Sequence, residues 1–246
     1  MKFSIITICF NSEDIIRKTI ESVLYQDYIG EVEYLIIDGA SKDRTVDIAK
    51  EYKESFEKKG YRYIIISEPD NGIYDAMNKG IRRSTGDIIG IINSGDWYET
   101  KALSTVASVY MDSRFDMFYA DINLIKKDGS IIIKHSKYDK IVTSRHWNHP
   151  TSFITKDIYD ELGLYRCKGI HDDFEFLLRV KKTGKKIEIR NIVLANFMTG
   201  GASNSKSIKK SIKRIKDRYK CYRINGYSPL YFIECLGIEI AKIIIS

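Results

Sequence analysis

The 246-residue sequence has little of what marks several large protein classes. It contains only 3 prolines, which excludes long proline-rich linkers, and it shows no internal repeat or low-complexity segment. No run of about 18 apolar residues occurs, so no transmembrane helix is expected. The N-terminus enters a strand pattern at once, without the apolar stretch of a signal peptide. These absences predict a globular protein that works in the cytoplasm.

Cysteine spacing and glycine motifs exclude further classes. Cys9, Cys167, Cys221 and Cys235 lack the spacing of metal ligands, and a reduced cytosolic protein is their simplest interpretation. There is no GxxxxGK loop, and no GxGxxG follows the first predicted strand. The chain is therefore neither a P-loop phosphotransferase nor a standard dinucleotide enzyme.

The first hundred residues alternate between two kinds of pattern. Apolar, β-branched segments predict buried strands at 3–10, 33–37, 61–67 and 87–92. Helical spacing of apolar residues between them predicts helices at 12–26, 44–58 and 74–83. We expect Ser12 at the N-cap of the first helix and Gly80 at a helix C-cap. This alternation indicates a parallel sheet with right-handed crossovers.

Polar residues follow three of these strands. Asn11 comes after the first, Asp38 after the second, and the turn 93–96 (Asn-Ser-Gly-Asp) after the fourth. The carboxyl ends of parallel strands share one edge, where open α/β sheets bind ligands. Gly95 lets the backbone approach a ligand closely, and Asp96 can hold a divalent ion that binds a diphosphate. One such turn is explained by a solvated loop, whereas several at one edge indicate a site.

The second half has shorter and more varied elements. Strands and helices are predicted at 101–112, 117–123, 131–134, 152–154 and 156–162. His149 lies in a polar-aromatic loop, where a structural role before Pro150 and a ligand contact both stay open. Asp172 and Asp173 begin a further helix. A carboxylate held beside another is a candidate general base, with simple helix capping by Asp172 as the alternative.

Positive charge is concentrated near the C-terminus. Residues 206–223 include nine Lys and Arg residues and a single Asp. The formal net charge of the whole chain is +7, so the rest of the chain is close to neutral. Apolar residues between these cations predict an amphipathic basic helix. A second helix at 230–245 is too short and too charged to span a membrane. Packing of both helices on the domain and in-plane docking on an anionic membrane are the two interpretations.

In order and spacing, these motifs resemble the inverting family 2 glycosyltransferases of the GT-A fold. The resemblance covers nearly all of residues 3–205, and bacterial enzymes that build O-antigen, capsule or exopolysaccharide look closest. It is carried by 7–11, 38–45, 70–80 (DNGIYDAMNKG), 93–96, His149, 172–173 and 200–203.

The resemblance implies the fold and its division. We expect an α/β, Rossmann-like, mostly parallel sheet with flanking helices and a C-terminal helical extension. Residues 1–98 would bind the nucleotide sugar, 99–205 would form the acceptor half of the same domain, and 206–246 would be the extension.

Roles on the donor side follow from the same resemblance. Thr7 and Phe10 would line the nucleobase pocket, and Asp38 would hydrogen-bond a uracil. The nucleotide-sugar side would be ordered by Asp75, Asn78, Lys79, Ser94 and Gly95. The glycine-rich loop at 200–203 would cover the donor phosphates, with Lys206 nearby.

Chemical roles are also implied. Asp96 would carry Mn²⁺ or Mg²⁺ on the donor diphosphate, although the family's metal motif usually has a second acid here. Asp173 would be the base that deprotonates the acceptor hydroxyl, with His149 and Asp172 on the acceptor side.

The function implied is transfer of a sugar from a nucleotide-diphosphate sugar, a UDP-sugar by expectation. The acceptor would be a saccharide, linked to a polyprenyl diphosphate, in bacterial surface polysaccharide synthesis. The protein would lie on the inner face of the cytoplasmic membrane, and nucleic acid is not an expected partner.

Two rival functions are weighed against this transferase. The first is an anionic-surface or nucleic-acid binding protein that acts through its basic helix, but such a protein has no use for acidic turns at one sheet edge. The second is a nucleotide-sugar binding protein without activity, which release of UDP from a donor panel would distinguish.

Overall fold

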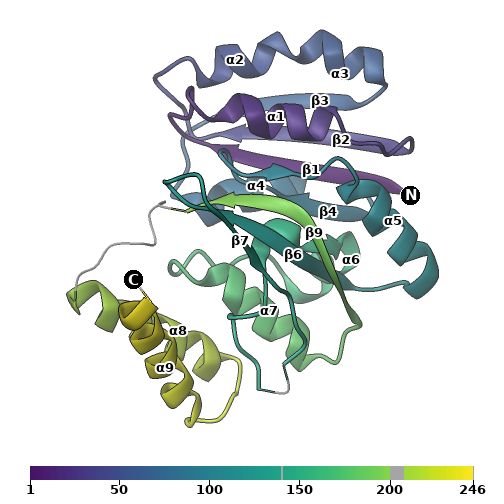
Figure 1. Cartoon of the computed structure of the whole chain (residues 1–246). Helices are drawn as coiled ribbons and strands as arrows, with labels where there is room; N and C mark the ends of the chain where they lie inside the picture. Colours follow the sequence, from purple (N-terminus) through teal and green to yellow (C-terminus); the bar gives the residue numbers. More distant parts are fainter. Residues whose placement is uncertain (140, 200–207, 246) are drawn as a thin grey trace.

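The computed structural model describes residues 1–139, 141–199 and 208–245, which form a mixed sheet with helices on both faces (Figure 1). In this part of the chain the sheet has nine strands, ordered β3-β2-β1-β4-β8-β6-β9-β5, and β7 pairs with β6. Strands from both sides of residue 98 belong to this one sheet, and the predicted division at that residue stays a prediction.

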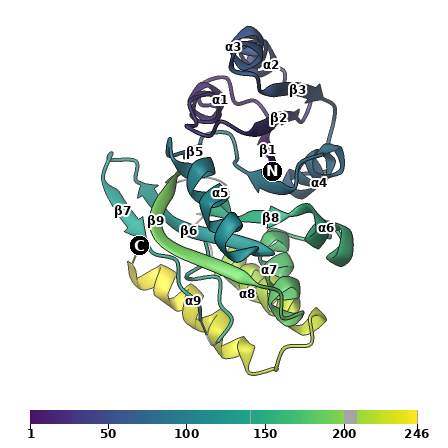
Figure 2. The same ribbon diagram turned by 90° about the vertical axis from the view of Figure 1, so that its right-hand side faces the viewer.

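The first four strands are parallel, as predicted. They are β1 (Lys2–Cys9), β2 (Glu31–Asp38), β3 (Arg62–Ser67) and β4 (Ile88–Ile91). The helices that connect them are α1 (Ile16–Leu24), α2 (Thr45–Glu51), α3 (Lys53–Lys59) and α4 (Ile73–Arg83). α1 and α4 lie on opposite sides of β1 and β2 (Figure 2). The carboxyl ends of these strands therefore share one edge, with helices covering both faces.

The second half extends the sheet with antiparallel and parallel strands. It contains α5 (Ala102–Ser113), β6 (Met117–Ile125), β7 (Ile131–Lys134), β8 (Phe153–Thr155), α6 (Lys156–Leu162), α7 (Asp172–Lys182) and β9 (Ile187–Met198). The short β5 (Trp97–Tyr98) pairs with β9, and the one-turn 3₁₀ helix η1 (His149–Thr151) precedes β8. β8 runs antiparallel to both β4 and β6, which joins the two halves.

Three local expectations were wrong. Ser12 is not an N-cap: α1 begins at Ile16 without a side-chain cap, and the Ser12 hydroxyl lies 3.0 Å from that of Ser94. The single helix expected at 44–58 is broken at Tyr52, whose hydroxyl donates to Glu21 of α1 at 2.7 Å. Contacts with residues distant in sequence therefore accompany both differences, at Ser12 and at Tyr52.

Gly80 is the third correction, because it lies inside α4 rather than at its end. A Cβ at Gly80 would lie 2.6 Å from Cγ2 of Ile6 in β1, closer than real Cβ contacts. The missing side chain lets α4 pack directly against the sheet. This close packing fixes the position of the residues at the start of α4.

The C-terminal extension forms two helices that pack on the domain, α8 (Ile208–Ile224) and α9 (Tyr231–Ile245) (Figure 1). Tyr222 and Cys235 are fully buried and join the core that contains α7. No helix in the described ranges is long and apolar enough to cross a membrane. The first of the two interpretations of this extension, packing on the domain, is what the structure shows.

Two of the predicted surface cations are buried instead. Arg214 and Arg218 are 8% and 4% exposed and face Glu239 of α9, which is 2% exposed. Arg214 donates to both carboxylate oxygens at 2.7–3.1 Å, and Arg218 lies 3.8 Å from one of them. Glu239 therefore neutralises buried charge between the two helices.

We predict that Glu239→Ala loosens the extension. Breaking a buried ion pair by removing one partner costs roughly 3–5 kcal/mol, because the remaining charge stays buried. Hydrogen exchange in α8 and α9 should accelerate, and the urea midpoint should fall. The matched control is Glu57→Ala, where a 60% exposed side chain lies 4.0 Å from Lys53. Equal effects of the two changes would contradict the prediction.

Candidate functional site

The loops after β1 and β2 are joined at the carboxyl edge of the sheet. The Asn11 N–H donates to the Ser41 hydroxyl at 2.8 Å, and the Asn11 side-chain oxygen accepts from the Lys42 N–H at 2.9 Å. The Gly39 N–H donates to the Cys9 carbonyl at 2.9 Å. The two loops therefore form one backbone surface above the strand ends.

Asp38 is fully buried beneath this surface. Its carboxylate accepts from the Ser41 N–H at 2.9 Å, from the Ser41 hydroxyl and from the Ser67 hydroxyl at 2.6 Å. Burial and the Asp38 charge together raise the pKa of the Cys9 thiol above its usual range. In this arrangement Asp38 holds the loop in place, and its contact with a uracil stays a prediction.

Phe10 and Thr7 are placed differently from one another. The Phe10 side chain is 61% exposed and lies beside Gly39, where a Cβ would also collide with Asp70 at 2.6 Å. Thr7 is fully buried in the sheet, and its hydroxyl accepts from Tyr34 at 2.9 Å. The Thr7 side chain is therefore already hydrogen-bonded in the interior, whereas the Phe10 ring is exposed, and the contact of each with a nucleobase stays a prediction.

The turn after β4 carries a buried carboxylate. Asp96 is 5% exposed, and one oxygen accepts from the Met198 N–H at 3.0 Å. Burial without a neighbouring cation raises the pKa of Asp96 to about 7. The Ser94 hydroxyl contacts Ser12, and the Gly95 N–H donates to the Thr19 hydroxyl at 3.0 Å. The loop after β1, helix α1 and the end of β9 therefore hold the turn.

This turn fits a metal ion that arrives with its ligand. No group of three or more His, Cys, Asp or Glu side chains is placed to hold a metal within residues 1–139, 141–199 and 208–245. Within the same ranges, Oδ1 of Asn93 is buried and has no hydrogen-bond partner. Mg²⁺-type ions are bound by one or two carboxylates plus substrate phosphates. Asp96 and Asn93 supply oxygen ligands of that kind and number.

The α4 residues predicted for the donor side have distinct contacts. The Asp75 carboxylate accepts from the Asn71 N–H at 3.0 Å and lies 3.8 Å from Lys79. Lys79 donates to the Pro69 carbonyl at 2.5 Å. Both therefore order the loop at the start of α4.

Asn78 faces the other half of the domain. It is 3% exposed, and its amide both donates to the Tyr165 carbonyl at 2.8 Å and accepts from the Tyr165 N–H at 3.0 Å. It also donates to Cys167 at 3.3 Å. Asn78 thus holds the segment that leads into α7.

α7 begins with the predicted pair of carboxylates. Asp172 is 3% exposed and accepts from the Lys168 N–H at 2.6 Å, and burial raises its pKa. Asp173 accepts from the Tyr74 hydroxyl at 2.8 Å and from the Phe174 N–H at 2.7 Å. The two carboxylates therefore belong to different environments, with Asp172 bound to the loop before α7 and Asp173 facing α4.

His149 lies close enough to Asp173 to be influenced by its charge, and its contact with an acceptor stays a prediction. Burial lowers the pKa of His149, and the negative charge of Asp173 opposes that shift. The imidazole is therefore neutral at pH 7 and offers one donor and one acceptor. The structure brings His149 and Asp173 together with Tyr74, a residue that the sequence argument did not select.

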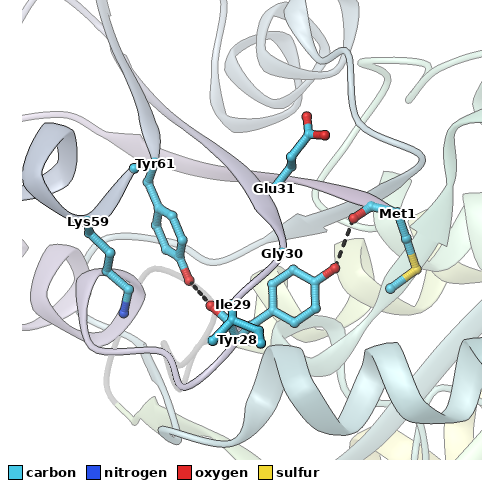
Figure 3. Close-up of a pocket in the computed structure, with 8 residues that line it drawn as sticks. Met1, Tyr28, Ile29, Gly30, Glu31, Lys59 and Tyr61 are labelled. Atoms are coloured by element: carbon cyan, nitrogen blue, oxygen red, sulfur yellow. Dashed lines mark hydrogen bonds between the residues drawn. The ribbon is translucent and has the colours of Figure 1, made fainter.

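One cavity lies beside the candidate site, and a second lies away from it. One of about 240 Å³ lies beside Asp172, between the segment before α7 and α8, and its lining includes Arg166, Lys168 and Lys220. A larger cavity, of about 680 Å³, lies near the start of β2 and is shown in Figure 3. There the Tyr28 hydroxyl donates to the Met1 carbonyl at 2.9 Å and the Tyr61 hydroxyl to the Tyr28 carbonyl at 2.7 Å. It lies at the opposite edge from Asp38 and Asp96, and these polar groups are already satisfied.

The predicted loop at 200–203 and Lys206 lie outside the described residues. Immediately before this loop, Thr199 donates to the Ile125 carbonyl through its N–H at 2.9 Å and its hydroxyl at 3.0 Å, and the Met198 N–H donates to Asp96. The covering role of this loop stays a prediction.

Residues 4–172 match the family model described as Glycosyl transferase family 2. An uncharacterized glycosyltransferase of Mycobacterium tuberculosis is 30% identical over 234 residues, which cover 91% of this chain and 86% of that protein. A dolichyl N-acetyl-alpha-D-glucosaminyl phosphate 3-beta-D-2,3-diacetamido-2,3-dideoxy-beta-D-glucuronosyltransferase of Methanococcus voltae is 28% identical over 232 residues, covering 86% and 70%.

Solved structures share the fold at low sequence identity. Staphylococcus aureus TarS 1–349 in complex with UDP-GlcNAc has a TM-score of 0.70 at 16% identity, covering 98% of this chain and 72% of that one. Mannosyltransferase PcManGT from Pyrobaculum calidifontis, in complex with GDP-Man and Mn²⁺, has a TM-score of 0.65 at 14% identity, covering 96% and 68%. The predicted GT-A fold is thereby confirmed.

We predict that Asp96→Asn stabilises the fold at high pH. The folded protein holds the Asp96 proton more tightly than the unfolded chain, so this stabilisation is complete below about pH 4 and is lost as the pH rises to about 7. Asparagine stays neutral and keeps an acceptor for Met198. In urea unfolding at pH 8 the variant should gain up to roughly 4 kcal/mol, and the gain should shrink to less than half at pH 5.

The control for this prediction is Asp128→Asn. Hydrogen bonds from Ser130 lower the pKa of Asp128, which is fully exposed, so this change should bring no gain at pH 8. If the gain of Asp96→Asn is the same at both pH values, a cause other than carboxylate burial is at work.

Proposed function

This chain belongs to glycosyl transferase family 2 and is a glycosyltransferase acting on nucleotide sugars, and we propose that it transfers the sugar of a UDP-sugar, with inversion, to a lipid-linked saccharide. One observation carries the proposal. Asp173, a carboxylate suited to proton abstraction, is hydrogen-bonded across to the donor-side helix α4 at 2.8 Å. Acceptor activation and donor binding therefore share one end of the sheet.

The nucleotide is proposed to lie against Phe10 and the loop after β2. Phe10 offers an exposed ring for the base, and Asp38 keeps the backbone of that loop fixed. Preference for uracil is supported by TarS, a structure of the same fold in complex with UDP-GlcNAc. The GDP-Man complex of PcManGT makes guanine the alternative base.

The donor diphosphate is proposed to bind at the turn after β4 together with Mn²⁺ or Mg²⁺. When bound, the ion would neutralise charge that develops on the leaving nucleoside diphosphate. Asp96 would hold the ion, and the buried oxygen of Asn93 is a second oxygen for the ion or a donor hydroxyl. The Mn²⁺ in the PcManGT complex supports a divalent ion.

Asp173 is proposed to accept the proton of the acceptor hydroxyl. That hydroxyl is a poor nucleophile until a base removes its proton, and direct attack on the face opposite the diphosphate inverts the anomeric centre. Neutral His149 would orient the acceptor sugar by a hydrogen bond. Asp172 would fix the segment at Lys168, and the acceptor would occupy the cavity beside that segment.

The rival in which the basic helix binds nucleic acid is disfavoured. Arg214 and Arg218 are turned into the interior against Glu239 and are not available to a phosphate backbone. The remaining rival, donor binding without transfer, is decided by an assay. UDP release should be measured across UDP- and GDP-sugars with a lipid-diphosphate-linked saccharide, with and without Mn²⁺.

We predict that Asp173→Asn lowers turnover roughly a hundredfold or more, because the acceptor proton loses its base. Donor affinity, measured by calorimetry with UDP and Mn²⁺, should be unchanged, since Asp173 contacts the acceptor. Asp157→Asn, an exposed acid in the first turn of α6, is the control and should match the parent. Loss of UDP affinity with turnover preserved at saturating donor would assign Asp173 to binding.

The outer face of the extension is proposed to rest on an anionic membrane that carries the acceptor. Along α9, Ile233 and Ile240 are 68% and 54% exposed, and Phe232 is 43% exposed. Glu239 is turned inward, and Glu234 accepts from the Thr143 hydroxyl at 2.5 Å. The outer face of α9 is therefore apolar in its described residues, and it lies beside the cations of α8.

We predict that replacing the exposed Lys213, Lys216 and Lys220 with Gln weakens sedimentation with phosphatidylglycerol vesicles. Each cation near an anionic surface contributes about 1 kcal/mol, so three losses amount to orders of magnitude at low salt. The difference should fade at high salt.

The charge-matched control changes Lys50, Lys53 and Lys58 of α2 and α3, which are also exposed. Equal loss in both variants would mean unspecific attraction. Vesicle binding that no variant alters, together with a concentration-dependent dimer, would assign the apolar face to a second copy of the chain.

A further inference from the structure

We propose that Tyr74 is a positioning residue for the base Asp173, so that the donor-side helix α4 sets the geometry of acceptor activation. This inference rests on the proposed function. Tyr74 lies in the second position of α4, and Asp173 lies 99 residues later, in the first turn of α7. The hydroxyl of Tyr74 donates to Oδ1 of Asp173 at 2.8 Å and lies 3.2 Å from the Ile170 carbonyl.

The Tyr74 hydroxyl is a fixed donor. The side chain is 7% exposed, and its ring lies 5.4 Å from that of Tyr165, which limits its rotation. Burial and the charge of Asp173 raise the pKa of Tyr74 far above its usual range, so it stays protonated at any working pH. A phenol that stays protonated and whose shorter hydrogen bond goes to Oδ1 restrains rotation of the carboxylate.

The Phe174 N–H also donates to Oδ1 of Asp173, at 2.7 Å. The two donors together occupy one oxygen of the carboxylate. Oδ2 is then the oxygen that faces away from these donors and is available to the acceptor proton. A carboxylate with one anchored oxygen presents a single, defined lone-pair direction, which proton transfer requires.

A second contact fixes the same helices relative to each other. One turn after Tyr74, Asn78 binds the Tyr165 backbone through both its donor and its acceptor. α4 thereby holds the loop before α7 at two points. The same helix begins beside Asp70, whose carboxylate accepts from the Gly72 N–H at 2.8 Å at the donor edge. One rigid element therefore touches the donor loop and the base.

Other charged or titratable groups also act on Asp173. They are Asp172 on α7, His149 on η1, Tyr165 in the loop before α7 and Cys221 on α8. His149 and Asp172 are proposed to face the acceptor, and the electrostatic links to Tyr165 and Cys221 bring no hydrogen bond to the Asp173 carboxylate. Tyr74 is the only side chain in the described residues that donates a hydrogen bond to Asp173 in this structure.

The test compares Tyr74→Phe with Tyr165→Phe in the full-length chain. Tyr165 is the matched control, because it is a buried tyrosine in ring contact with Tyr74 whose hydroxyl contacts that of Tyr159 at 3.5 Å. Tyr74→Phe should lower kcat roughly tenfold or more, since a hydrogen bond to a charged group is lost. UDP affinity and donor KM should stay at parental values.

The pH dependence of kcat distinguishes positioning of Asp173 from a purely structural role of Tyr74, because loss of a structural role would not shift it. The ionised carboxylate loses a donor in Tyr74→Phe, so the acid limb of kcat should move to higher pH by about half a unit to one unit. Tyr165→Phe should leave that limb in place. If both variants lose activity equally with an unshifted limb, Tyr74 is a packing residue and the inference is overturned.

The outcomes also separate this inference from the proposed function. A parent protein that releases no UDP from any donor in the panel overturns both. A parent that transfers sugar, with Tyr74→Phe indistinguishable from it in kcat and in pH profile, overturns the role of Tyr74 alone.

Discussion

The close packing of α4 on β1 is the constraint on which the rest of the site depends. Gly80 has no side chain, so the helix lies directly against Ile6. From that position Tyr74 and Asn78 reach the other half of the domain and hold the start of α7. A helix displaced outward by a methyl group would move both contacts. The placement of the candidate base thus depends on a backbone approach in the core.

The site also stores an unfavourable interaction. Asp96 is buried without a neighbouring cation, which is why its pKa rises to about 7. An isolated buried carboxylate weakens the free fold at neutral pH, and on the proposed function an ion bound with the donor would remove that penalty. If Asp96 holds the proposed ion, this loss of stability in the free protein would contribute to its affinity for the metal-bound donor. The second oxygen that the turn provides, on Asn93, is left unsatisfied in the same way.

The sequence predicted the fold and the edge where the polar turns meet, because both follow from strand-helix alternation and the geometry of parallel sheets. It did not predict which way side chains point. The full burial of Thr7 could not be predicted, because a strand covered on both faces is apolar throughout and its pattern does not show which way each residue points. Tyr74 was missed since an aromatic residue at helical spacing looks like core, and its partner is distant in sequence. Arg214 looked like a surface cation until α9 placed Glu239 against it.

That buried ionic contact has a consequence for the outer surface. α8 is rich in cations, and α9 is largely apolar but contains acidic residues. The outer surface of this helix pair is basic and apolar only if those acids are neutralised in the interior. Glu239 is neutralised by the two arginines inside the pair, and Glu234 lies against Thr143 and 3.8 Å from Arg145.

The same contacts bind the extension to the acceptor side. The Tyr222 hydroxyl donates to the Val142 carbonyl at 2.6 Å, and the Val142 N–H donates to the Tyr231 hydroxyl at 3.2 Å. The segment held in this way leads to His149. Burial of the two arginines against Glu239 therefore has two consequences. The outer face of α9 carries no exposed acid in its described part, and the segment that leads to His149 is held against the extension. The proposed docking on a membrane and the proposed orientation of the acceptor would then be properties of one packed unit rather than of a separate tail and domain.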